Sequence, residues 1–451
     1  VQFMLFGTTK LKYYILTGDV SNDNIYHAVN LYKTNKPEYE YFYKPIYSWN
    51  TSSIVDMSGL FKDDISFNEN IGSWNVTNVT NMSQMFQNAS TFNYDLNWTT
   101  TNVENMSQMF YGASAFNGNI SNWTTTNVEN MSQMFQGASA FNGNISNWNT
   151  SQVTTMSQMF RGASAFNKDL FWTTTNVENM SQMFRGASAF NGNISNWNVG
   201  NVNTMALMFY GASQFNKNLN SWTTTNVESM TQMFQGASAF NGNISDWDVS
   251  EVNSMKGMFQ NASAFNGNIS NWDVGKVTNM QSMFHNATNF NRNLNSWDVS
   301  NVNNMSYMFV SDGNNSKFDG NIISWNVDKV QTMLYMFYGA PLFNQDISGW
   351  NTSQVTNMEG MFQGALKFNQ HIGKWDISNV TNMNSMFYGA SSFNQSLSNW
   401  GAISFSNVAG FDPSSTRINV LSMLTGTTNL KYYILTGDVS NDNIYQAVYL
   451  Y

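Results

Sequence analysis

The sequence predicts a right-handed α/β solenoid of about fifteen coils, and three observations indicate it. The 15 tryptophans run from Trp49 to Trp400 at intervals of 25 residues, apart from two intervals of 24 and one of 28. Of the 29 methionines, 26 stand in pairs whose members are three residues apart. The residues between these markers recur in the same order. Such a period is typical of solenoids, because one repeat cannot bury its apolar face without its neighbours.

Each coil is predicted to hold one short helix of about two turns. The residue three positions after each Trp from Trp49 to Trp375 is Ser, Thr, Gly or Asp, the types that cap helix starts. Thr101 with Glu104 has the spacing of a capping box. Gly137 marks the end of one such helix. The apolar residues of that coil recur at helical spacing: Val128, Met131, Met134, Phe135 and Ala138.

One short strand is predicted in the remainder of each coil. Phe141, Ile145 and Trp148 are too widely spaced for a second helix. Asn142 and Asn144 are typical turn residues. We therefore expect a strand around Ile145 to Trp148, a parallel sheet on one face of the solenoid, helices on the other, and ladders of Trp, Met, Phe, Val and Ile in the core.

The repeat pattern resembles that of a known family. It reads W-[DN]-x-[ST]-x-V-x-x-M-x-x-M-F-x-G-A-x-x-F-N-x-x-[IL]-x-x-W, and residues 247–272 match it closely. It resembles the surface-protein repeat of Mycoplasma and Listeria lipoproteins, which is grouped with BspA-like leucine-rich repeats, over roughly residues 46–400. The resemblance implies a leucine-rich-repeat-like solenoid in a surface or secreted setting, and it transfers no catalytic residue.

Four regions are expected along the chain. Residues 1–48 are predicted to form an N-terminal cap, with a strand at 12–16 and a helix from Asn24 to about Tyr32. Residues 49–400 form the solenoid, and 401–419 form a C-terminal cap or linker. Residues 420–451 repeat residues 1–32 at 26 of 32 positions and begin a second copy of the N-terminal cap. With Val1 as first residue, we expect an excerpt or a processed product of a longer polypeptide.

The second copy predicts a head-to-tail assembly of the protein with itself. A cap that follows a solenoid is expected to start the next link, whether the links are covalent or separate subunits, and such contacts do not close. We expect the predicted strand and its copy to form the joint by adding to a neighbour's sheet edge. The joint residues are Lys12, Tyr13, Tyr14, Ile15, Leu16, Lys431, Tyr432, Tyr433, Ile434 and Leu435.

Composition excludes several classes of function. Only 10% of residues are charged, and the net charge is −9, so the basic footprint of nucleic-acid binding is missing. No run of 18 apolar residues predicts a membrane span. Without cysteine there are no disulfides, thiolate metal sites or thiol catalysis. No cofactor is expected, and no histidine has a recurring acidic or nucleophilic neighbour, so we expect no enzyme.

Three features suggest sites, each with a simpler interpretation. The insertion between Phe309 and Phe318 is a weak candidate for a hard cation such as calcium, and it is otherwise a solvated loop; its candidate ligands are Asp312, Asn314, Asn315 and Asp319. The Met pairs suggest soft metals, but their spacing beside Phe and Val favours core packing. Threonine runs such as Thr124–Thr126 suggest an ice-binding ladder, which Asn149 interrupts, so helix capping and a polar turn are preferred.

The predicted function is that of an extracellular structural protein, at a cell or virion surface, forming one link of a filament. The alternative is a surface adhesin that recognises a glycan or a protein. Its binding surface would be the concave strand face, with small polar residues such as Ser121, Asn122, Ser195 and Asn196.

Overall fold

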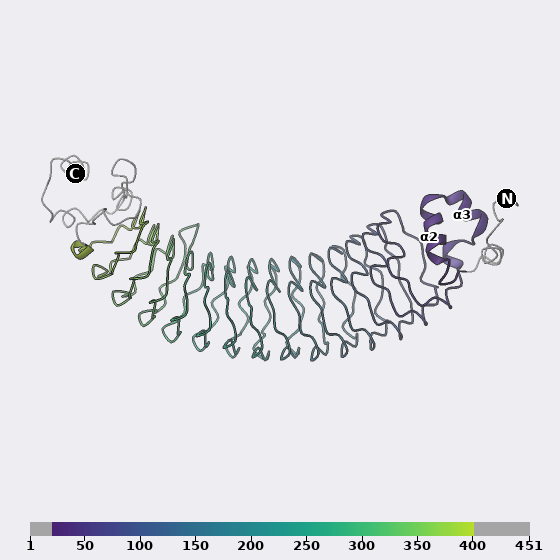
Figure 1. Cartoon of the computed structure of the whole chain (residues 1–451), viewed down its shortest axis with the longest axis horizontal. Helices are drawn as coiled ribbons and strands as arrows, with labels where there is room; N and C mark the ends of the chain where they lie inside the picture. The colour runs from purple at the N-terminus through teal and green to yellow at the C-terminus, as the bar shows by residue number, and fades with distance from the viewer. Residues whose placement is uncertain (1–19, 401–451) are drawn as a thin grey trace. The chain divides into compact units, whose positions relative to one another are not determined.

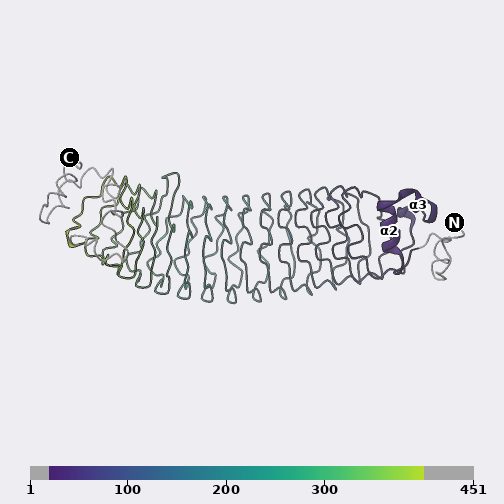
Figure 2. The ribbon, with the colours of Figure 1, turned by 45° about the horizontal axis from the view of Figure 1, so that its top comes forward.

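The computed structural model describes residues 20–400, and within each of its compact units 25-residue coils stack side by side as a repeat solenoid (Figures 1 and 2). The chain divides into two compact units, one ending at Lys217 and one beginning at Asn218. Each unit is built from the same coil, so one coil explains the architecture of both. The predicted strand at 12–16, its copy at 431–435 and the predicted C-terminal cap lie outside the described residues.

Two α-helices precede the first coil (Figure 1). Helix α2 spans Ile25–Thr34, where the sequence predicts a helix from Asn24 to Tyr32. Helix α3, Lys36–Phe42, was not predicted; the side chain of Asn35 accepts a hydrogen bond from the peptide N–H of Glu38 and caps its start. Two 3-10 turns, η1 (Ile46–Ser48) and η2 (Ser398–Trp400), stand at the two ends of the coils.

The prediction of a helix in each coil is wrong: no helix is present between residues 50 and 397. The segment that carries the Met pair is a run of turns instead. Gln108 lies inside the predicted helix, yet it has a φ of 56°, and Gly112 has a φ of 67°. Two left-handed residues four positions apart cannot belong to a right-handed helix.

Hydrogen bonds between coils replace those of the expected helix. The peptide N–H groups of Gln108 and Phe110 donate to the carbonyls of Ser132 and Met134 in the next coil, at 2.9 and 2.8 Å. The N–H of Met109, between them, donates within its own coil to the carbonyl of Met106 at 3.3 Å, and the N–H of Tyr111 donates likewise to the carbonyl of Gln108 at 3.0 Å. Alternate N–H groups therefore bond across coils and within the coil, and both sets of buried amides are satisfied.

The predicted strand is also displaced. Ser146 and Asn147 form a turn before Trp148, and no strand occurs around Ile145. Parallel pairing occurs as isolated bridges at the residue before each Met pair, for example Asn105 to Asn130 and, in the second unit, Ser254 to Asn279. The predicted sheet is thus reduced to single bridges in a different part of the coil.

The prediction of a core built from ladders is confirmed. Side chains at the Trp, Met, Phe, Val and Ala positions of the coils are buried. The ring of Phe110 stacks on Phe116 of its own coil at 3.9 Å and on Phe135 of the next coil at 5.6 Å. Trp123 and Trp148 stack at 6.1 Å. Stacked coils bring equivalent side chains together, which is why a regular sequence gives a regular core.

Asparagine ladders support the same stack from the surface. In most coils that have a Phe-Asn pair, the Asn side chain accepts a hydrogen bond from the next coil. Asn117 N–H donates to Asn93 Oδ1 at 2.8 Å, and Asn142 N–H donates to Asn117 Oδ1 at 2.8 Å. In the second unit Asn266 N–H donates to Asn241 Oδ1 in the same way. Asn142, predicted as a turn former, thus also joins neighbouring coils.

Candidate functional site

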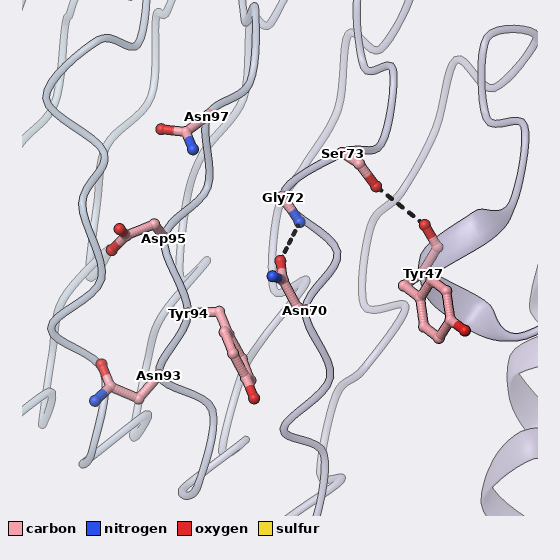
Figure 3. Close-up of a pocket in the computed structure, with 8 residues that line it drawn as sticks. All are labelled: Tyr47, Asn70, Gly72, Ser73, Asn93, Tyr94, Asp95 and Asn97. Carbon is pink, nitrogen blue, oxygen red and sulfur yellow. Dashed lines mark hydrogen bonds between the residues drawn. The ribbon is translucent and has the colours of Figure 1, made fainter.

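The candidate site is a hollow of about 710 Å³ on the first unit (Figure 3). It is open to solvent, and polar and aromatic residues from three successive segments line it. These residues are Tyr47, Asn70, Gly72, Ser73, Asn93, Tyr94, Asp95 and Asn97.

A change in coil length explains the position of the hollow. Gly72 and Ser73 form a turn before Trp74, as the equivalent residues do in most coils. The next coil lacks one residue before Trp98, and no turn forms there. The space that such a turn would fill beside Gly72 and Ser73 stays open as the hollow.

Two tyrosine rings are exposed at this site. Tyr47, from η1, is 55% exposed, and Tyr94, from the shortened coil, is 37% exposed. The coil segment that carries Asn70 and Gly72 lies between them (Figure 3). The Ser73 hydroxyl donates to the carbonyl of Tyr47 at 3.0 Å and joins the turn to η1.

The polar side chains of the hollow are held by the backbone. Asn70 Oδ1 accepts from Gly72 N–H at 3.1 Å, and Asp95 Oδ1 accepts from Asn119 N–H at 2.7 Å. Asn93 belongs to the asparagine ladder described above. Within residues 20–400, the Nδ2 groups of Asn70 and Asn93 and the side chain of Asn97 form no hydrogen bond. The hollow therefore presents oriented amide donors beside a carboxylate.

The second shortened coil has different chemistry. Phe171, in the place of Asn97, is 57% exposed. Lys168 stands in the place of Tyr94, and Asp169 Oδ1 accepts from Asn193 N–H at 2.7 Å, as Asp95 does from Asn119. The hydrogen bond to the Asp side chain thus occurs in both shortened coils, whereas the tyrosine occurs only in the first.

The candidate cation ligands of the insertion are engaged elsewhere. Asp312 Oδ2 lies 3.1 Å from His285 Nε2 and accepts from Asn286 Nδ2 at 2.8 Å. The hydrogen bond from Asn286, more than the nearby His285, lowers the pKa of Asp312. Two of the remaining candidates accept separate hydrogen bonds: Asn315 Oδ1 accepts from the Ser311 hydroxyl, and Asp319 Oδ1 accepts from Asn344 N–H. The peptide N–H of Asn314 donates to the carbonyl of Ser311 at 3.0 Å.

The described part of the chain contains neither a candidate metal-binding cluster nor a helix that could span a membrane. Among residues 20–400, no group of three or more His, Cys, Asp or Glu residues is placed to hold a metal ion. Searched over the same residues, no helix has the length and apolar character needed to cross a bilayer. His27 is exposed on α2, and His285 contacts Asp312 as described.

The threonine runs contribute contacts between coils. The middle threonine of a run is buried, and its hydroxyl donates to a carbonyl of the next coil. Thr100 donates to Thr124 at 2.8 Å, and Thr125 donates to Asn149 at 2.7 Å. Buried Val76 and Val199 take this place in other coils. The third threonine, predicted as a helix cap, has no helix to cap.

The predicted strand-face residues lie in turns. Ser121 and Asn122 form the turn before Trp123, and Ser195 and Asn196 form the turn before Trp197. The N–H groups of the two serines donate to Asn119 Oδ1 and Asn193 Oδ1, both at 3.0 Å. Sequence reasoning proposed these positions and missed the hollow. The signal for the hollow was Tyr94, where Gly118 and Gly143 stand in the next two coils.

Comparisons with known proteins identify the repeat. A family described as "Mycoplasma protein of unknown function, DUF285" matches residues 18–97, 96–171, 171–264, 239–314 and 311–419. None of the curated proteins matches the chain. A solved structure titled "Crystal structure of TLR13-ssRNA13 complex" is similar over 77% of this chain at 11% identity, with a TM-score of 0.25. The match covers 47% of that chain, and a similarity this low does not establish a shared fold.

Proposed function

Because the chain belongs to the DUF285 family, whose description names no activity, we propose a function from its own contacts. The protein is a non-enzymatic, extracellular structural protein that forms one link of a head-to-tail assembly. The observation that carries this proposal is the way residues 20–32 contact the first coil, together with the repetition of those residues near the other end of the chain.

Hydrogen bonds attach the start of the chain to the first coil. Asn22 Nδ2 donates to the carbonyl of Ser53 at 3.1 Å, and Asn22 Oδ1 accepts from Val55 N–H at 2.9 Å. The Tyr26 hydroxyl donates to the carbonyl of Ser58 at 3.0 Å. These contacts satisfy backbone groups of the first coil that have no preceding coil to bond.

Apolar and aromatic contacts complete this interface. Ile25, Ala28 and Val29 of α2 are buried. Tyr32 donates to Glu69 Oε1 at 2.9 Å, and its ring lies 6.2 Å from that of Phe67. The helix thus covers an apolar end that a solenoid would otherwise expose.

The second copy retains every one of these contact residues. The residues equivalent to Asn22, Ile25, Tyr26, Ala28, Val29 and Tyr32 are Asn441, Ile444, Tyr445, Ala447, Val448 and Tyr451. Between residues 20 and 32 only two positions differ in the copy: Gln446 stands in the place of His27, and Tyr449 in the place of Asn30. Both His27 and Asn30 are exposed. The copy therefore has the side chains needed to cover a first coil.

A filament forms when the copy in one molecule covers the first coil of another molecule. If residues 439–451 of one link cover the first coil of the next, the contact joins two different surfaces and does not close. The exchange resembles domain swapping, in which an identical element replaces its own counterpart. The BspA-like leucine-rich-repeat assignment is part of the same proposal, supported by the stacked coils and their single parallel bridges.

Analytical ultracentrifugation of the 451-residue chain tests the proposal. We expect concentration-dependent assembly, and more of it in an Asn22→Ala/Tyr26→Ala variant, because the first coil then loses its own cover. Adding Asn441→Ala/Tyr445→Ala should abolish that assembly. Gln446→His, which changes an exposed position only, is the matched control. A wild-type chain that stays monomeric at all concentrations would overturn the proposal.

A further inference from the structure

We propose that the hollow around Tyr94 binds a neutral saccharide. This inference rests on residues 47–97 alone and does not depend on assembly of the chain. The volume of the hollow, about 710 Å³, lies within the range of roughly 300–1,000 Å³ that is typical of small-molecule sites in proteins.

The two tyrosines provide aromatic faces for the ligand. A tyrosine ring combines an apolar face with a polar hydroxyl, and a pyranose ring likewise has an apolar C–H face and polar edges. Tyr47 and Tyr94 are exposed although most aromatic residues of the coils are buried. Exposed rings on two sides of the coil segment that carries Asn70 suit a ligand that lies over that segment.

Polar side chains of the hollow match hydroxyl groups. Asn70 and Asn93 use their Oδ1 atoms within the coils, which leaves their Nδ2 groups as donors toward a ligand. The carboxylate of Asp95 offers acceptors, with one oxygen held by Asn119 N–H. Among residues 20–400, no Lys, Arg or His lines the hollow. An anionic ligand therefore has no charged partner there, whereas a neutral polyol can both donate and accept.

Tyr94 is not required by the repeat. The equivalent residues of the next two coils are Gly118 and Gly143, and the later position 168 is a lysine. Glycine, lysine and tyrosine therefore all occur at this position of the coil, and the Tyr94 side chain is partly exposed and not part of the core. The Tyr at 94 is thus a local addition to the coil that also lost its turn, and the two changes together make the hollow.

A protein ligand is the competing possibility. Tyr, Ser, Asn and Gly are also common in antibody combining sites, which bind proteins. The hollow is concave and local, with aromatic faces and amides in one small volume, and this geometry favours a compact ligand over a flat surface. Protein binding is accordingly one outcome of the test that would contradict the proposal.

Saturation-transfer NMR with defined sugars is the test. The full chain is mixed separately with maltotriose, cellotriose, mannotriose and N,N′-diacetylchitobiose at millimolar concentration. We expect saturable transfer to at least one of them, weakened about tenfold or more by Tyr94→Gly and by Tyr47→Ala. Asp95→Asn tests the carboxylate, because its amide oxygen can still accept from Asn119 N–H.

Matched variants separate binding from folding. Tyr388→Gln changes an exposed tyrosine of the second unit to the residue found one coil earlier, Gln363, and should leave binding unchanged. Asp169→Asn alters the equivalent Asp of the other shortened coil and should also have no effect. Each variant must keep the parent circular dichroism spectrum. The proposal is overturned by no saturable transfer to any of the four sugars, by transfer that survives Tyr94→Gly, or by binding of peptides alone.

Discussion

The indole Nε1 of Trp123 donates a hydrogen bond of 2.8 Å to the carbonyl of Leu96 in the preceding coil. The same contact recurs at Trp148 and, in the second unit, at Trp272. A buried indole needs a partner for its N–H, and at these three tryptophans the partner is a carbonyl group of the preceding coil. These tryptophans are therefore both core residues and links between consecutive coils.

The Phe184 ring should contribute strongly to stability. It is fully buried and stacks on Phe160 at 5.5 Å and on Phe190 at 3.9 Å. We expect Phe184→Ala to lower the free energy of unfolding by about 3–5 kcal/mol, because it leaves a cavity between coils. Chemical denaturation measures this. Phe171→Ala, at an exposed Phe of the same unit, should change stability by less than about 0.5 kcal/mol; equal losses in the two variants would contradict the core assignment.

The left-handed position at Gly137 should discriminate between Ala and Asn. Gly137 has a φ of 72°, and a Cβ atom there would meet Gly112 at an ordinary 3.6 Å, so conformation and not space limits substitution. Gly137→Ala should cost about 1–2 kcal/mol. Gly137→Asn should cost less, because Asn88 and Asn261 adopt this conformation in equivalent places. Thermal unfolding of both variants checks the order, and an Ala variant at least as stable as the Asn variant would refute it.

Aspartates in the turns after the tryptophans should make stability depend on pH. Hydrogen bonds from the Ser300 hydroxyl and N–H lower the pKa of Asp298, and Ser250 does the same for Asp248. A carboxyl group whose pKa is lower in the folded state stabilises that state above its unfolded pKa of about 3.9. This contribution is lost as the pH falls through the folded pKa.

Replacement of these aspartates by Asn should weaken that dependence. Asn75 and Asn198 occupy the position in other coils and accept the same N–H bond, at 3.0 Å to Thr77 and Gly200. We expect a variant with Asp248→Asn and Asp298→Asn to lose less stability between about pH 5 and pH 2 than the parent. Melting temperatures across this range provide the measurement, and parallel curves for the two proteins would show that these groups do not contribute.

The Thr125 hydroxyl should contribute modestly to the stack. It is buried and donates to the carbonyl of Asn149 at 2.7 Å. We expect Thr125→Val to cost about 0.5–1.5 kcal/mol through the lost hydrogen bond. Thr125→Ala should cost more, since it also removes packing that Val76 and Val199 supply at this position. A Val variant less stable than the Ala variant would be inconsistent with this role.

Much of the fold could be predicted from the period, because stacking forces equivalent residues together. The burial of Met131, Met134 and Phe135 followed from their recurrence in every coil. Helical spacing nevertheless led to a wrong local structure, since residues three apart also converge when successive turns point side chains to one side. The sequence did contain a sign of the left-handed residue inside the predicted helix: Gly257 and Gly360, both with positive φ, stand where other coils have Gln.

The candidate site was harder to predict than the core. The missing residue before Trp98 was visible in the sequence, but its effect depends on whether the neighbouring coil keeps its turn at Gly72 and Ser73. Conversely, the acidic and amide residues of the insertion near Asp312 suggested a cation site by composition alone. Their contacts differ because Asp312 and Asp319 bond to different neighbouring coils.

Cryo-electron microscopy of the 451-residue chain tests the proposed assembly most directly. We expect filaments in which residues 439–451 of one link contact the first coil of the next through Asn441 and Tyr445, as Asn22 and Tyr26 contact it within the chain. Single particles in which residues 439–451 pack against their own coils, with no contact between molecules, would contradict it.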